Sequence, residues 1–135
     1  MGALIAESEA EALSFLRRLA DEWTSGANRF EGPGEVLFVA RIAGHAVGVC
    51  GLNVDPYAGD SRVSRVRHLY VRAAQRRAGI GRRLVAEIIA AARGRFGRLR
   101  LRTQNPEAAR LYEQLGFRRS PGERDCTHVM DLVGR

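Results

Sequence analysis

Two glycines and four arginines lie close together in the stretch Arg76-Arg77-Ala78-Gly79-Ile80-Gly81-Arg82-Arg83. Glycine removes the Cβ atom where a ligand would approach the backbone. A helical pattern begins here, and the free N–H groups in the first turn of a helix favour an anion. The arginines add positive charge on both sides. The stretch therefore predicts a phosphate-binding site.

The spacing of these glycines narrows the kind of site. It is not G-x-G-x-x-G, and no Gly-Lys-Ser/Thr follows, so neither the dinucleotide fingerprint nor the P-loop fits. The alternative to a ligand site is a turn followed by an arginine-coated helix.

The elements around the turn predict a β-α-β unit. Residues 62–71 have the composition of a strand, and an apolar stripe of helical period follows over residues 81–93. Residues 98–103 form the next predicted strand. A connection of this length implies parallel pairing with a right-handed crossover.

A second motif runs from residue 105 to residue 117. Asn105 is a predicted helix N-cap, Pro106 occupies the first helical position, and Gly116 is the predicted stop. Two patterns in the chain resemble the two signatures of the GNAT superfamily of N-acetyltransferases. They are Arg76-x-x-Gly79-x-Gly81 and Asn-x-x-Ala-x-x-Leu-Tyr…Leu-Gly-Phe. The resemblance covers roughly residues 35–133.

The resemblance implies an α/β fold (a mixed α+β sheet) with a splayed parallel strand pair flanked by helices, in a single domain over residues 1–135. Its implied function is transfer of an acetyl group from acetyl-CoA to a primary amine by direct attack in a ternary complex, without a metal. The implied cofactor-binding residues are Leu69, Tyr70, Val71, Arg76, Arg77, Ala78, Gly79, Gly81, Arg82 and Asn105.

The resemblance implies that backbone groups of Leu69, Tyr70 and Val71 bind the pantetheine by hydrogen bonds, in the way that a sheet edge binds an additional strand. Residues 76–82 carry the pyrophosphate, and Asn105 contacts the coenzyme. Tyr112 occupies the family position that protonates the departing thiolate. The alternative for Tyr112 is an aromatic residue of the core.

No residue is assigned as the general base. His68 is the titratable candidate on the 62–71 strand, although strand alternation places it opposite Leu69 and Val71. Asp55 and a water chain are equal rivals, and His45 is weaker. If the fold is of this family, Asn53, Asp55 and Tyr57 lie near the acceptor end. Ordinary turn chemistry is the alternative explanation of these last three residues.

The remaining segments complete the predicted domain. Residues 35–42 and 45–54 form a hairpin through Ala43 and Gly44, and residues 117–120 and 127–132 are late, antiparallel strands. A capping box at Ser8 opens a helix that extends to Trp23. The first strand, within residues 3–6, is short or missing, and residues 24–34 form a loop.

Positive charge is concentrated near the predicted phosphate site. Residues 62–102 contain thirteen arginines and one glutamate, a net charge of +12, whereas the rest of the chain carries −5 and the whole chain +7. The excess positive charge would steer an acidic substrate or nucleic acid to the protein. The alternative is that these arginines form a solvated surface without a partner. The alternative function is a non-catalytic acyl-CoA-binding or RNA-binding module. Few aromatic residues accompany the arginines, so nucleic acid is not the expected partner.

Length and composition indicate one soluble domain. The sequence has 135 residues and contains no apolar run of membrane-spanning length, so we expect a cytoplasmic protein that binds no membrane. Cys50 and Cys126 lack metal-ligand spacing and are predicted to be reduced packing residues. The acceptor is a small-molecule or peptide amine, and a homodimer is left open.

Overall fold

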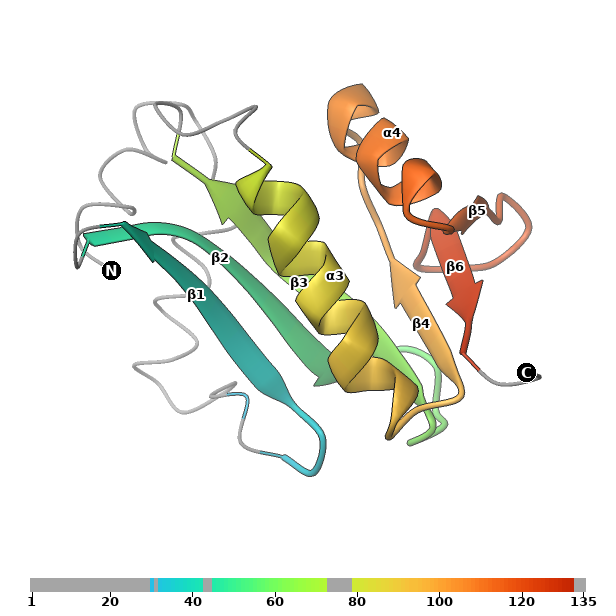
Figure 1. Ribbon diagram of the computed structural model, residues 1–135. Coiled ribbons are helices and arrows are strands. Elements are labelled where there is room, and N and C mark those ends of the chain that lie inside the picture. Colours follow the sequence, from blue (N-terminus) through green and yellow to red (C-terminus); the bar gives the residue numbers. More distant parts are fainter. Residues whose placement is uncertain (1–29, 31, 43–44, 73–78, 133–135) are drawn as a thin grey trace.

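The computed structural model of the protein describes residues 30, 32–42, 45–72 and 79–132 (Figure 1). Its elements in this part of the chain are β1 (Val36–Ile42), β2 (His45–Val54), β3 (Val63–Val71), α3 (Ile80–Arg93), β4 (Arg98–Leu101), α4 (Pro106–Gln114), β5 (Arg118–Arg119) and β6 (His128–Asp131). The strands form one sheet in the order β1-β2-β3-β4-β6-β5. The pair β3 and β4 is parallel, and the other neighbours are antiparallel. The predicted mixed sheet with a parallel crossover is confirmed.

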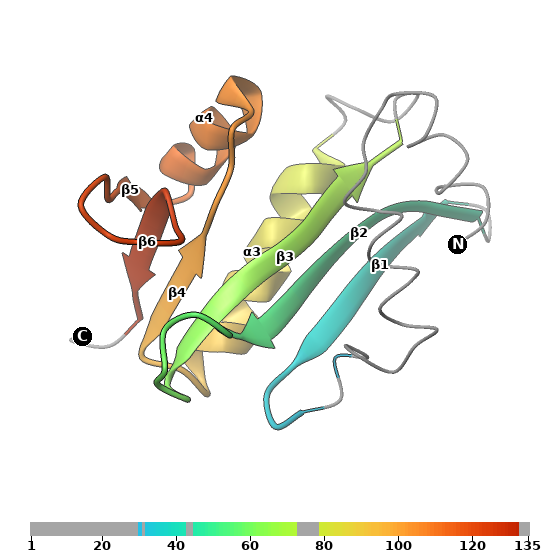
Figure 2. The same cartoon turned by 180° about the vertical axis from the view of Figure 1, so that it is seen from behind.

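The parallel pair is joined over a short length. Val63 to Arg65 of β3 pair with Arg98 to Arg100 of β4, and β3 then continues to Val71 paired with β2 but not with β4. Figures 1 and 2 show the two strands diverging from this end, with α3 over β3 and α4 over the far end of β4. The splay expected between the two strands is present.

The late strands are shorter than predicted. The segment expected over residues 98–103 ends at Leu101, because the N–H of Thr103 donates to the side chain of Thr127 instead of to a strand. Residues 117–120 contribute only Arg118 and Arg119, since the N–H of Phe117 still donates to the last turn of α4. Side-chain acceptors and helix closure thus shorten strands whose composition alone predicts more pairing.

The core lies between the sheet and α3. Leu84, Val85 and Ile88 of the helix are buried against sheet residues such as Leu52 and Leu99. Gly48 permits this approach, because a Cβ atom there would lie 3.1 Å from Leu84 Cδ1 and 3.2 Å from the carbonyl oxygen of Tyr70. Tyr112 of α4 and Met130 of β6 belong to the same core cluster, so α3 and α4 cover the same face of the sheet.

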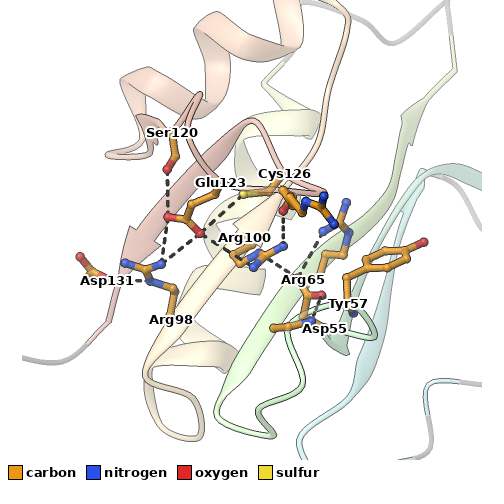
Figure 3. Close-up of polar contacts among 11 residues, drawn as sticks. Asp55, Tyr57, Arg65, Arg98, Arg100, Ser120, Glu123, Cys126 and Asp131 are labelled. Atoms are coloured by element: carbon orange, nitrogen blue, oxygen red, sulfur yellow. Dashed lines mark hydrogen bonds and ion pairs between the residues drawn. The ribbon is translucent and has the colours of Figure 1, made fainter.

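The opposite face carries a buried charge network where β3 and β4 meet. Asp55 Oδ2 lies 3.2 Å from Arg65 Nη1 and 3.1 Å from Arg100 Nε (Figure 3). The Asp55 side chain is fully buried, and those of Arg65 and Arg100 are 8% and 10% exposed. Arg100 also donates to the carbonyl oxygen of Arg124. One carboxylate thus joins the two strands at their last paired residues.

Several predicted segments lie outside the described residues. They are the helix over residues 8–23, the first strand, most of the 24–34 loop, and the turn at Ala43 and Gly44. Of the helices in the described part, neither has the length and apolar character needed to cross a membrane.

Asp55→Asn should destabilise the fold by about 3–5 kcal/mol, because it leaves two buried guanidinium groups with reduced countercharge. Asparagine keeps the oxygen that accepts from the N–H groups of Tyr57 and Ala58, so the turn itself should survive. The matched control is Glu87→Gln, which removes an exposed pair with Arg83 and should cost less than about 0.5 kcal/mol. Urea unfolding of both variants measures the difference, and similar midpoints for the two would contradict this account of the network.

Candidate active site

A β-bulge interrupts β3 beside the splay. Val49 pairs with Tyr70 and Gly51 with Arg67, so Cys50 of β2 faces two residues of β3, His68 and Leu69. His68 takes a φ of 61°, in the left-handed region that few non-glycine residues adopt. The extra residue redirects the end of β3 where β4 has already diverged.

The end of β3 turns backbone donors toward the splay. The N–H of Arg72 donates to Val47 of β2, so alternation along the strand turns the N–H groups of Leu69 and Val71 toward the β4 side. The side chains of Leu69 and Val71 pack against the α3 core. Tyr70 is buried on the other face with Phe30 and Val49. Backbone rather than side chains of these residues therefore lines the splay.

The turn before α3 brings a helix N-terminus to the same end of β3. Gly79 is the N-cap with a φ of 85°, which glycine adopts without strain. A Cβ atom at Gly81 would lie 3.7 Å from Val71 Cγ2 and 3.6 Å from Leu111 Cδ2, so β3, α3 and α4 converge there. Arg82 is exposed and donates to Gln114 Oε1 of α4. Arg76, Arg77 and Ala78 lie outside the described residues.

Asn105 caps α4 as its position in the sequence predicts. Its Oδ1 accepts from the N–H of Glu107 at 2.8 Å and from that of Ala108 at 3.2 Å. Its own backbone N–H donates to Thr103 Oγ1. In the described part of the chain the amide nitrogen of this exposed side chain has no hydrogen bond, so it can serve a ligand while the oxygen holds the cap.

Tyr112 is buried on the inner side of α4. Its ring packs edge-on against Phe117, with centroids 5.6 Å apart, and lies 6.5 Å from the ring of His128. Burial raises the pKa of the phenol above its ordinary value, and an electrostatic interaction with the Cys50 thiol acts in the same direction. Tyr112 and Cys50 belong to the same core cluster, against which Leu69 also packs.

A polar chain that sequence reasoning missed supports α4 beside Tyr112. Glu113 Oε2 accepts from Arg119 Nε at 2.9 Å and lies 2.8 Å from His128 Nε2. His128 Nδ1 lies 2.9 Å from Thr127 Oγ1, which accepts from the N–H of Thr103. The hydrogen bond from His128 is the main cause that lowers the pKa of Glu113. Only the position of Glu113 next to Tyr112 hinted at this chain.

The two cysteines and Asp55 have buried positions in which they contribute to packing or to ion pairs. Cys50 and Cys126 are both buried and free, and burial raises the pKa of each thiol. Asp55 is held between two arginines where β3 begins, at the end of the strand remote from Val71. Asp55 thus has a structural position at the closed end of the splay, and its nearness to the acceptor stays a prediction.

The remaining base candidates are located as follows. His68 is buried and packs edge-on against Phe30, with ring centroids 6.2 Å apart, which agrees with a packing histidine. Tyr57 is exposed and stacks on the Arg65 guanidinium at 5.0 Å, and Asn53 is buried. The side chain of His45 lies outside the described part. No general base follows from these positions.

Comparison with known proteins decides the family. The model of the acetyltransferase (GNAT) domain matches residues 33–119, which is more than half of the chain. The chain belongs to the GNAT acetyltransferase family. Its fold class and its two motifs agree with this membership. In the described part of the GNAT chain, no group of three His, Cys, Asp or Glu side chains could hold a metal ion.

Solved structures of acetyltransferases resemble the chain over most of its length. A protein from Exiguobacterium sp. 255-15, assigned as an acetyltransferase, has 29% identity and a TM-score of 0.82, covering 95% of this chain and 82% of its own. Ribosomal-protein-alanine N-acetyltransferase from Brucella melitensis has 25% identity and a TM-score of 0.66, covering 85% and 78%. A Salmonella typhimurium structure assigned to the acetyltransferases and solved with its cofactor acetyl-CoA has 20% identity and a TM-score of 0.67, covering 88% and 74%.

Asn105→Ala should lower the stability of the protein by about 0.5–2 kcal/mol, because it removes the acceptor for two N–H groups at the start of α4. Asn105→Asp keeps that acceptor and should retain most of the stability. Thermal unfolding of the two variants tests the cap. An alanine variant as stable as the aspartate variant would mean that the side-chain oxygen is dispensable.

Proposed function

We propose that the protein is an acetyl-CoA-dependent N-acetyltransferase that acts on a primary amine. The observation that carries the proposal is the convergence of three features at one end of the splay. These are the bulge in β3, the N-terminus of α3 and the phenol of Tyr112. Family membership supplies acetyl transfer, and the acetyl-CoA found in the Salmonella typhimurium structure supports the choice of acetyl donor.

The residues at the splay suit acetyl-CoA in four ways. The N–H groups of Leu69 and Val71, turned toward the β4 side, can hold the amides of an extended pantetheine chain. The first turn of α3 offers N–H groups to the pyrophosphate, and Gly79 and Gly81 keep side chains away from it. Arg82 can add charge-assisted hydrogen bonds to the phosphates. To do so, its guanidinium group must break its hydrogen bond to Gln114 Oε1 or keep it with only part of its donors. Asn105 has its amide nitrogen available.

The chemistry then requires little beyond positioning. Acetyl-CoA supplies an activated acyl group, and the amine nitrogen attacks the thioester carbonyl carbon. A C–N bond forms, the C–S bond breaks with its electron pair remaining on sulfur, and the proton that the nitrogen loses balances the one that the sulfur gains. A backbone N–H at the bulge can polarise the carbonyl oxygen. The group that removes the proton from the amine is not assigned.

Tyr112 is the proposed donor to the departing sulfur. The raised pKa keeps its hydroxyl protonated well above neutrality, so the donor is always present at physiological pH. The same shift makes it a weak acid, so it acts chiefly by hydrogen bonding as negative charge develops on sulfur. The ring contacts with Phe117 and His128 limit how the hydroxyl can move.

Gly81→Val should abolish detectable acetyl-CoA binding, because its methyl groups would occupy the space where the phosphates meet the first turn of α3. The fold should persist, since a Cβ atom here makes only ordinary contacts with Val71 and Leu111. Gly94→Ala is the control at the other end of α3, where an added Cβ has no neighbour within 4 Å. Calorimetry with acetyl-CoA compares them, and unchanged affinity in the valine variant would exclude this phosphate site.

Tyr112→Phe should lower kcat by about 100-fold while leaving the affinity for acetyl-CoA nearly unchanged. The estimate lies at the lower end of general-acid effects, because a thiol of pKa about 8.5 leaves tolerably without help. The ring, and with it the packing against Phe117, is retained. Because KM equals affinity only when chemistry is slow, the affinity is measured separately by calorimetry.

The pH profile supplies the control for this variant. A phenol with a raised pKa stays protonated as the pH rises to about 10, so the wild type should show no loss of kcat from its ionisation below that pH. Full kcat in the phenylalanine variant on a good acceptor would show that Tyr112 is a core aromatic only.

A further inference from the structure

Alternate residues of β4 form a row of arginines on the face of the sheet opposite α3. Leu99 and Leu101 belong to the core beneath α3, so Arg98 and Arg100 point to the other face. The extended backbone continues beyond the strand, because two hydrogen bonds to Thr127 hold it. The carbonyl oxygen of Leu101 accepts from the N–H of Thr127, and the N–H of Thr103 donates to Thr127 Oγ1. Arg102 therefore continues the row.

The facing strand adds two arginines to the same face. Arg65 is paired in register with Arg100. Arg67 lies two residues further along β3, opposite Gly51 and before the bulge, so it shares the face of Arg65. We call these five residues the arginine ladder: Arg65 and Arg67 on β3, and Arg98, Arg100 and Arg102 on the β4 side.

Acidic side chains neutralise the ladder at the closed end of the splay. Asp55 lies between Arg65 and Arg100, and Arg98 bonds both Glu123 and Asp131 (Figure 3). Arg102, at the open end, is exposed and has no hydrogen bond or ion pair within the described part of the chain. The charge of Arg102 thus lies uncompensated where β3 and β4 have separated, within the described part of the chain.

The position of Arg102 separates it from the phosphate site. The first turn of α3, with Gly79 and Gly81, lies on the face that the two helices cover. Arg102 projects to the other face of the sheet, away from α3 and α4, so an anion held there would be separate from the coenzyme phosphates. A guanidinium group offers a planar pair of N–H donors that matches a carboxylate or a phosphate.

We propose that Arg102 binds an anionic group of the acceptor at the open end of the splay. The acceptor class is then a small amine that carries a carboxylate or a phosphate several bonds from its nitrogen. The proposal rests on the proposed N-acetyltransferase function. It deepens that function by naming the charge of the acceptor.

The test compares amines that differ in one charge, with acetyl-CoA saturating. The pair γ-aminobutyrate and its amide tests a carboxylate, and the pair phosphoethanolamine and ethanolamine tests a phosphate. For at least one pair, kcat/KM should be at least about 10-fold higher for the anionic member, as expected for hydrogen bonds to a charged group. The two arms tell which anion is preferred.

Arg102→Gln should raise KM for the preferred anionic amine by about 10- to 100-fold and leave kinetics with its neutral partner unchanged. Arg102→Lys should recover part of the preference, because it keeps the charge and loses the planar donor pair. Arg93→Gln removes the same charge from an exposed site in the last turn of α3 and controls for general electrostatic steering. Acetyl-CoA affinity should be equal in all three variants.

Three outcomes would overturn the assignment. They are equal kcat/KM within both pairs, loss of activity toward neutral amines to the same extent in Arg102→Gln, or failure of every anionic amine in an enzyme that binds acetyl-CoA. Absence of acetyl-CoA binding in the wild type would instead refute the proposed function. Calorimetry with acetyl-CoA thus separates the two failures.

Discussion

The short parallel pairing of β3 and β4 is the constraint on which the rest of the structure depends. If the parallel pairing of β3 with β4 continued to Val71, β4 would accept from the backbone N–H groups of Leu69 and Val71. The strand β3 would then offer no edge to a ligand. Pairing ends after Arg65 and Arg100. The bulge at His68, the pairing with β2 and the packing of α3 then hold the end of β3, whereas β6 pairs with β4. The proposed binding edge thus lies inside the sheet, between two of its central strands.

The charges at the closed end explain how so short a pairing can persist. Three inter-strand residue pairs alone would be a weak junction between two halves of a sheet. Asp55 adds an ion pair to each strand at its last paired residue, in a site where its own side chain is fully buried. Buried pairs often add little net stability over apolar packing, but a lone buried charge is expensive. The network therefore favours one register, because any slip would leave a buried arginine or Asp55 unpaired.

Local patterns in the sequence predicted the elements well, and long-range contacts account for what they missed. Asn105, Pro106 and Gly116 mark the ends of α4 because caps depend only on neighbouring residues. The bulge at His68 was not predicted, since the strand reads as regular and the extra residue is defined only against β2. The burial of Arg65 and Arg100 was equally hidden. Each reads as a solvated residue until Asp55, distant in the sequence, is placed between them.

The buried phenol of Tyr112 shows why a candidate site cannot be judged from ordinary pKa values. In water a phenol is a weaker acid than a thiol, so complete transfer of its proton to a thiolate would be unfavourable. Burial raises the pKa of Tyr112 further. In the proposed mechanism a thiolate that forms beside the buried phenol would be destabilised by desolvation as well, and its basicity would rise too. The shift of Tyr112 alone therefore does not set the difference between the two pKa values. The hydroxyl can stabilise the sulfur as charge develops, since what matters is the difference between the two pKa values inside the cleft.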